Sequence, residues 1–179
     1  PADARTAHPT VAAGMAAASV FGNDRIAAVF DEIADLLEVQ DENPFRIRAY
    51  RNAARTVGEF GKDMRELIAQ NHDLTELPGV GKDLAAKIHE IVATGSCATL
   101  QKLRRQVPAA VTELLRLPGL GPKRVKTLWH DLDVQTIEQL HRAARDGRLR
   151  ELPGFGPKTE QRILEAIAEH SETVTRFKL

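Results

Sequence analysis

Three short and nearly identical segments of the sequence could bind an anion through their backbone. They read Leu-Pro-Gly-Val-Gly-Lys at residues 77–82, Leu-Pro-Gly-Leu-Gly-Pro-Lys at 117–123 and Leu-Pro-Gly-Phe-Gly-Pro-Lys at 152–158. Proline and glycine favour a tight turn, and glycine also tolerates a positive φ and a close approach of the backbone to a ligand. A helical pattern follows each segment, so the free N–H groups at the start of that helix would face the ligand. A phosphate oxygen fits this arrangement.

One such segment alone could be ordinary punctuation between helices, with a C-cap glycine followed by a proline. Three matching copies favour phosphate binding. The candidate binding residues are the glycines of the turns and the basic residues that follow them, namely Gly79, Gly81, Lys82, Gly119, Gly121, Lys123, Arg124, Lys126, Gly154, Gly156 and Lys158. We expect the third copy, which has Glu151 beside the turn and Phe155 inside it, to be more structural than the other two.

Charge is balanced over the whole chain but segregated along it. The 179 residues, enough for one or two small domains, contain 25 basic and 25 acidic side chains. Residues 24–42 hold seven acids and one arginine, whereas residues 45–56 hold four arginines and no acid. Residues 98–126 hold seven basic side chains and one acid. A local field can therefore attract phosphates although the net charge is zero.

The sequence shows no pattern typical of a metal site, a membrane span or a signal peptide. The single cysteine, Cys97, and the six histidines lack the spacing of metal ligands. No apolar run reaches the length of a membrane span, and residues 12–20 lack the pattern of a signal peptide. We therefore expect a cytoplasmic monomer with no membrane partner and no small-molecule substrate. Residues 1–22, rich in alanine, are expected to be a disordered leader or vector-derived sequence.

The elements that must position these segments are all helical. Apolar residues follow the helical period in helices expected to begin at Asn23, which would be a cap, at Pro44 after Asn43, and after Asp63. A further helix follows the first turn and ends at Gly95. No alternating strand pattern competes with this all-α interpretation.

In the second half of the chain, helical patterns likewise precede and follow the other two turns. Pro108 is expected to start the helix that leads into the second turn, and Thr136 with Gln139 fits a capping box. We therefore expect a four-helix unit with one helical hairpin from about Asn23 to Gly95, followed by a helical unit with two further hairpins.

The segment from Asn43 to Arg51, Asn-Pro-Phe-Arg-Ile-Arg-Ala-Tyr-Arg, is followed by the first hairpin and by Leu-Ala-Ala-Lys-Ile at residues 84–88. This combination resembles the N-terminal region of family X (polymerase β-like) DNA polymerases, and is most similar to the bacterial branch. The turns resemble that family's helix-hairpin-helix motifs. The resemblance implies an 8-kDa-type DNA-binding domain at residues 23–96, a fingers-type domain at 97–172 and the start of a palm domain, otherwise absent, at 173–179.

An absent palm would remove the carboxylates that hold the divalent metal ions of nucleotidyl transfer, so the resemblance implies a chain that does not polymerise. Asp131 and Asp133 have the spacing of such a carboxylate pair but are expected in a solvated loop. The resemblance implies sequence-independent binding of gapped or nicked DNA, as the DNA-binding portion of a repair polymerase in base-excision or gap-filling repair at the bacterial nucleoid. A stand-alone tandem-hairpin protein for duplex or branched DNA is the alternative.

The same resemblance implies individual ligands. Arg46 and Tyr50 match residues of a 5′-phosphate pocket, with Arg48 and Arg51 in the same unopposed basic run, although Tyr50 could equally be a core residue. A monovalent cation, Na⁺ or K⁺, would lie between hairpin carbonyls and a DNA phosphate. Its ligands would be the carbonyls of Thr75, Leu77 and Val80 in the first hairpin and of Leu115, Leu117 and Leu120 in the second.

Lys87 matches the lysine that acts as Schiff-base nucleophile in the 5′-deoxyribose-phosphate lyases of the family. A nucleophilic lysine needs a lowered pKa. Asp83 and Glu90 lie one turn away on either side and would instead stabilise the charged ammonium. Family members with lyase activity have a lysine in place of Asp83 and a histidine in place of Phe45. A phosphate contact or an ion pair is therefore favoured for Lys87, with lyase activity as the alternative.

Overall fold

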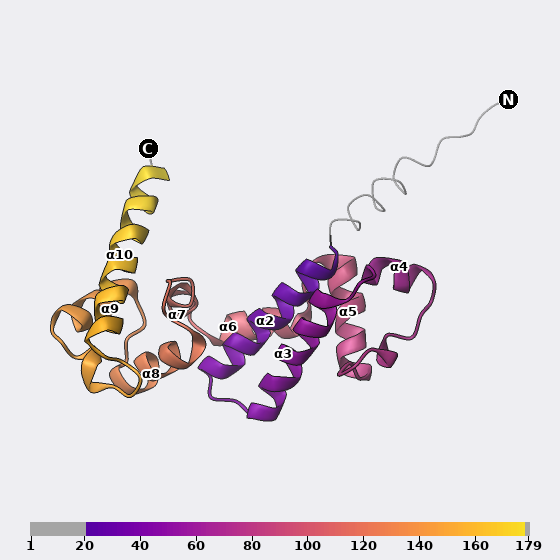
Figure 1. Ribbon diagram of the computed structural model, residues 1–179, viewed down its shortest axis with the longest axis horizontal. Coiled ribbons are helices and arrows are strands. Elements are labelled where there is room, and N and C mark those ends of the chain that lie inside the picture. The colour runs from indigo at the N-terminus through magenta and orange to yellow at the C-terminus, as the bar shows by residue number, and fades with distance from the viewer. Residues whose placement is uncertain (1–20, 178–179) are drawn as a thin grey trace. The chain divides into compact units, whose positions relative to one another are not determined.

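The computed structural model describes residues 21–177, which form helices and turns without any β-strand (Figure 1). The all-α expectation is confirmed. The chain divides into two compact units: one comprises residues up to Ala34 together with Pro44–Lys102, and the other comprises Asp35–Asn43 together with the residues from Leu103 onward. The expected leader, residues 1–22, lies outside the described residues except for its last two.

The first elements in chain order carry the first hairpin. They are α2 (Asn23–Val39), α3 (Pro44–Glu59), α4 (Met64–Ala69), the short 3₁₀ helix η1 (Leu74–Glu76), α5 (Lys82–Thr94) and α6 (Ala98–Gln106). The first hairpin connects η1 to α5. Gly95 ends α5 as expected, with φ +84° and its N–H donating to the Ile91 carbonyl at 2.7 Å.

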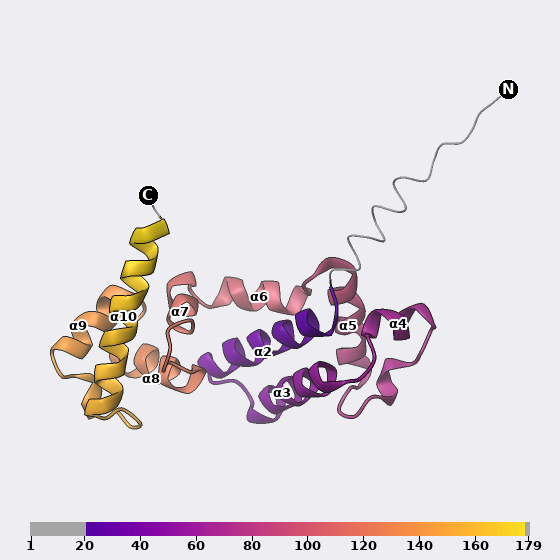
Figure 2. The same cartoon turned by 45° about the horizontal axis from the view of Figure 1, so that its top comes forward.

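The remaining elements carry the other two hairpins. They are α7 (Ala109–Leu114), α8 (Pro122–Leu132), α9 (Ile137–Arg145), the 3₁₀ helix η2 (Leu149–Glu151) and α10 (Pro157–Phe177). The second hairpin connects α7 to α8, and the third connects η2 to α10. Helices α9 and α10 pack side by side, as the turned view also shows (Figure 2). Residues 173–177, expected to begin a palm domain, continue α10.

The apolar positions of α2 form the centre of the first core, as their helical spacing predicts. Ile26, Phe30 and Ile33 are completely buried. The ring of Tyr50 from α3 is also buried and meets the ring of Phe30 edge to face, with centroids 5.8 Å apart. Each such side chain stabilises the fold by about 1.5–3 kcal/mol relative to an exposed one. The core therefore fixes α3, and with it the arginines on the outer face of α3.

Two helix starts carry a side-chain cap, and the one expected at Thr136 is confirmed. The carboxylate of Asp63 accepts a hydrogen bond from the N–H of Arg65 at 2.8 Å at the start of α4. Its side-chain bond to Arg65 also lowers the pKa of Asp63. Thr136 caps α9 by accepting from the N–H of Gln139 at 3.1 Å. The return bond from the Gln139 side chain goes to the N–H of Gln135 at 2.8 Å, one residue before the cap.

The cap expected at Asn23 is wrong. Its side chain instead accepts from the N–H of Met64 at 2.8 Å and donates to the Lys62 carbonyl at 2.9 Å. Asn23 therefore supports the start of α4, which lies far from it in the sequence and has Asp63 as its N-cap. Local spacing cannot reveal such a partner, because it depends on how the helices pack.

No helix within residues 21–177 is long and apolar enough to cross a membrane.

Candidate nucleic-acid interface

The three hairpins have the same backbone conformation. The first glycine of each turn has a positive φ: +76° at Gly79, +87° at Gly119 and +83° at Gly154. In each turn the N–H of the apolar residue between the glycines donates to the carbonyl of the leucine at the start of the segment, at 3.1, 3.1 and 3.2 Å. The first glycine is thus required by the turn itself, since a side chain at this φ would be strained.

The second glycine of each turn has a different explanation. Gly81 (φ −90°, ψ −172°) and Gly121 (φ −86°, ψ 175°) are extended, a conformation open to any residue. A Cβ built on Gly81, Gly121 or Gly156 would meet no atom within 4 Å. Neither backbone strain nor packing within the described chain therefore accounts for glycine at these positions. A ligand that approaches the backbone closely would account for it.

The helix starts beside these glycines present free backbone donors. Gly81 is the N-cap of α5 and Gly121 the N-cap of α8, and neither can donate or accept through a side chain. The first N–H groups of each helix lack an intrahelical partner and carry the positive end of the helix dipole. Backbone donors in an open, side-chain-free notch are suited to an anionic oxygen.

The basic residues at the hairpins divide into two groups. Lys82, Lys123 and Lys158 lie in the first turns of α5, α8 and α10, and each is exposed. These three can add charge next to the backbone donors. Lys126 lies one turn further along α8 and forms an ion pair with Asp41 at 3.3 Å, so its charge already has a partner within the protein.

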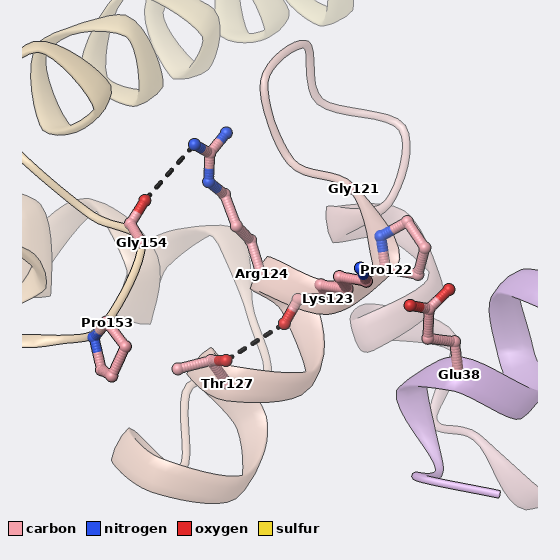
Figure 3. Close-up of a pocket in the computed structure, with 8 residues that line it drawn as sticks. All are labelled: Glu38, Gly121, Pro122, Lys123, Arg124, Thr127, Pro153 and Gly154. Atoms are coloured by element: carbon pink, nitrogen blue, oxygen red, sulfur yellow. Dashed lines mark hydrogen bonds between the residues drawn. The ribbon is translucent and has the colours of Figure 1, made fainter. Parts of the chain in front are cut away.

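Arg124 has a different environment from the one expected. Its Nη1 donates to the Gly119 carbonyl at 2.8 Å. Its Nη2 donates to the Gly154 carbonyl at 3.3 Å, the bond that Figure 3 shows. Its guanidinium carbon also lies 5.8 Å from the centroid of the Phe155 ring. The side chain therefore connects the second hairpin to the third. A cavity of about 640 Å³ beside it is lined by Gly121, Lys123 and Gly154, among others.

The arginine run on α3 is exposed at its start. Arg46 and Arg48 are exposed, and the guanidinium of Arg48 lies 6.0 Å from the centroid of the Phe45 ring, which is 76% exposed. Arg51 is half-buried and contacts other groups of the protein. Tyr50 is 3% exposed, so of its two interpretations the structure shows core packing.

Lys87 is held in its protonated form. Its Nζ donates to the Asp83 carboxylate at 2.7 Å, as the spacing predicts, and 14% of its side chain is exposed. Burial acts to lower the pKa of Lys87, but the hydrogen bond to Asp83, the charge of Asp83 and the nearby Tyr50 raise it, and the net shift is upward. The expected pairing of Lys87 with Glu90 is wrong. Glu90 instead accepts from the N–H of Ala98 at 3.0 Å and so caps α6, a helix that the sequence pattern missed.

Two of the six carbonyls expected to bind a monovalent cation, those of Leu77 and Leu117, have a described hydrogen bond. The Leu77 and Leu117 carbonyls each accept one backbone hydrogen bond, from Val80 and Leu120. A carbonyl oxygen has a second lone pair, so these atoms fit a cation, and the expected Na⁺ or K⁺ stays a prediction. Asp131 and Asp133 are exposed at the end of α8, and residues 21–177 contain no cluster of three or more acidic, histidine or cysteine side chains that could hold a metal ion.

Comparison with known proteins agrees with this geometry. Residues 21–97 match the family model described as a helix-hairpin-helix domain, and residues 111–169 match the model of a SAM-like helix-hairpin-helix tandem. The DNA polymerase/3′-5′ exonuclease PolX of Bacillus subtilis is 33% identical over 154 residues, which are 86% of this chain and 26% of the relative. The chain is related to the family X DNA polymerases. The resemblance expected from the sequence is thus confirmed.

A second group of relatives consists of Holliday junction proteins. The Holliday junction branch migration complex subunit RuvA of Pseudomonas fluorescens is 31% identical over 96 residues, and that of Pseudomonas aeruginosa is 30% identical over the same length. Each match covers 54% of this chain and 48% of the relative. The chain thus spans about a quarter of PolX and about half of RuvA.

Proposed function

We propose that this chain binds gapped or nicked DNA through its phosphates, without reading base sequence, as the DNA-binding portion of a family X repair polymerase. The observation that carries this proposal is the threefold hairpin, with an open second glycine beside free helix-start amides. Kinship to a DNA polymerase and to a Holliday junction protein supports DNA as the partner. The place of action would be the bacterial cytoplasm, at the nucleoid, with the chain as a monomer.

Independence of base sequence follows from the chemistry of the donors. Backbone N–H groups and lysines contact phosphate oxygens, which are the same at every nucleotide. Base readout needs side chains that enter a groove and match the pattern of base edges. The groups that the hairpins present are amides, glycines and the exposed Lys82, Lys123 and Lys158.

A 5′-phosphate at a gap is the preferred phosphate in this proposal. Arg46 and Arg48 are exposed on α3, which belongs to the same compact unit as the first hairpin. A terminal phosphate carries more negative charge than an internal one, and charge-assisted hydrogen bonds to arginine are among the strongest available. Such a site would hold the downstream strand of a gap.

Binding of the full chain to fluorescent DNA tests the proposal. We expect gapped duplexes of unrelated sequence to bind with equal affinity within about twofold, and a 5′-phosphate at the gap to raise affinity several-fold. Arg46→Ala should remove this gain, whereas Lys126→Ala, with its lysine paired to Asp41, should not. A strong preference among sequences would contradict the proposal. Tighter binding to a four-way junction than to a gap would instead favour the stand-alone, branched-DNA function that the similarity to RuvA supports.

Lyase activity through Lys87 is a separate question, and we expect little of it near neutral pH. Formation of a Schiff base needs an unprotonated Nζ, and the pKa of Lys87 is raised by its bond to Asp83. Borohydride should therefore trap little covalent complex with an abasic 5′-deoxyribose-phosphate substrate at neutral pH, and more as the pH rises toward the pKa of Lys87.

Asp83→Asn should increase the trapping because it removes the charge that stabilises the ammonium, whereas Asp83→Glu should leave trapping low. The carboxylate is largely exposed, so neither change disturbs the core. Efficient trapping by the unmodified chain at neutral pH, lost in Lys87→Ala, would show that the chain is a lyase.

A further inference from the structure

The guanidinium of Arg124 joins the tips of two hairpins. The two carbonyls that it contacts belong to Gly119 and Gly154, the positive-φ glycines of the second and third turns. The planar fork of arginine presents its donors in fixed directions, and so can hold two acceptors at a set separation. Its contact with the Phe155 ring adds a cation–π attraction to the third hairpin. Arg124 is therefore committed to protein groups on both sides.

Of the three hairpins, all within the described residues, the second alone has an arginine at the position from which Arg124 contacts another turn. The residue three positions after the second glycine is Arg124 in the second hairpin, Leu84 in the first and Thr159 in the third. Leu84 is buried in the core of its own unit. The connecting side chain is thus specific to the pair of hairpins that the second compact unit contains.

We propose that Arg124 is a positioning residue that fixes the second and third hairpins as one unit, so that they bind two phosphates of the same DNA together. This inference rests on the proposed function. Once one hairpin holds a phosphate, the other meets its own phosphate at a high effective concentration, provided that the two turns keep a fixed spacing. Preorganised turns also avoid the entropy cost of being ordered separately on DNA.

A direct phosphate contact by Arg124 is the competing role, and the two roles differ in the effect of lysine. Arg124→Lys keeps the positive charge but replaces the fork by a single ammonium, which cannot hold both carbonyls in one plane. If Arg124 contacts a DNA phosphate directly, DNA affinity should change little in Arg124→Lys. If Arg124 positions the two hairpins, DNA affinity should fall.

The salt dependence of binding separates the two roles further. Each phosphate neutralised by a protein cation contributes about 0.9 to the slope of log affinity against log salt concentration. We expect Arg124→Lys to weaken binding of the full chain to gapped DNA by about five- to tenfold with an unchanged slope. Lys123→Ala, which removes the neighbouring exposed lysine, should make the slope shallower by about 0.9 and should cause a smaller loss of affinity than Arg124→Lys.

A double-mutant cycle tests the coupling directly. Gly121→Asp and Gly156→Asp each disable one hairpin, and a Cβ at either position meets no protein atom. In the wild-type background we expect the double variant to lose less affinity than the product of the two single losses, because either change already breaks the joint contact. In the Arg124→Lys background the losses should multiply. A purely structural role of Arg124 would leave this non-additivity in place.

The outcomes are distinguishable. Wild-type affinity in Arg124→Lys, a salt slope reduced as in Lys123→Ala, or unchanged non-additivity in the cycle would each overturn the inference. If Gly121→Asp and Gly156→Asp leave DNA affinity intact, the proposed function itself fails. Circular dichroism monitors folding. If Arg124→Lys unfolds, Arg124→Gln, which keeps a planar donor group without charge, replaces it in the cycle. The result is then judged by whether the two glycine variants remain non-additive in the Arg124→Gln background.

Discussion

Gly121→Asp is expected to weaken DNA binding by about tenfold or more while the thermal stability of the chain stays the same or rises. Thermal stability and DNA affinity change in opposite directions because aspartate stabilises the start of α8 but repels the DNA phosphate. Gly121 is the extended N-cap of α8, with φ −86° and ψ 175°, and its Cβ would meet no atom within 4 Å. Aspartate is among the preferred N-cap residues, since its carboxylate accepts from the second or third N–H of the helix.

Those N–H groups are the donors that the proposed function assigns to a DNA phosphate. An aspartate at the cap would occupy them and would also place a negative charge where the phosphate must approach. A loss of tenfold corresponds to about 1.4 kcal/mol of binding free energy. Lys123→Ala, which removes one exposed and screened charge, should cost less.

Fluorescence anisotropy with a gapped duplex and thermal unfolding by circular dichroism give the two quantities. Gly121→Ser is the first control, because it supplies a cap without charge and should lose less affinity. Gly61→Asp is the second, because it adds the same charge at an exposed glycine that is outside the hairpins and has no neighbour within 4 Å. Wild-type affinity in Gly121→Asp, with the fold intact, would show that the helix-start amides do not grip the DNA.

The second large effect is that of salt on the unmodified chain. On a gapped duplex without a 5′-phosphate, if the exposed Lys82, Lys123 and Lys158 each neutralise a phosphate, the slope of log affinity against log salt is about −2.7. Affinity then falls by about 40-fold between 50 and 200 mM NaCl. Titrations of one gapped duplex over this range measure the slope.

A matched pair of lysines on α8 checks the assignment. Lys123→Ala should make the slope shallower by about 0.9, whereas Lys126→Ala should leave it unchanged, because Lys126 is paired with Asp41. The same slope in Lys123→Ala as in the unmodified chain would contradict a phosphate contact by Lys123.

The sequence predicted best what is determined by neighbours in the chain. The turns were predictable because proline and two glycines at fixed spacing restrict the backbone directly, and all three adopt one conformation. Helix ends with a local signal, such as Asp63 and Thr136, followed the same logic. The ion pair of Lys87 with Asp83 was predictable too, since residues four apart meet on one helix face.

What the sequence did not predict depends on partners that are distant along the chain or across a turn. The start of α6 is stabilised by the Glu90 carboxylate, eight residues before it, so that no local cap announces the helix. The Asn23 side chain accepts from the first N–H of a helix about forty residues away. Arg124 and Lys126 looked like phosphate ligands from their position after a hairpin, and only the packed structure shows that Gly154 and Asp41 engage them.

The division of the chain into compact units affects the order in which the protein can complete its folding. The second unit includes Asp35–Asn43, and these residues supply the Val39 carbonyl that lies 3.0 Å from Nε2 of His130, as well as the Asp41 carboxylate that binds Lys126. During translation these acceptors leave the ribosome before Pro44–Lys102, and their partners on α8 follow only afterwards. The second unit is thus assembled from two segments that are separated in the chain by Pro44–Lys102, and this intervening segment belongs to the first unit. A fragment that begins at Leu103 would lack both acceptors, however well it preserved the two hairpins themselves.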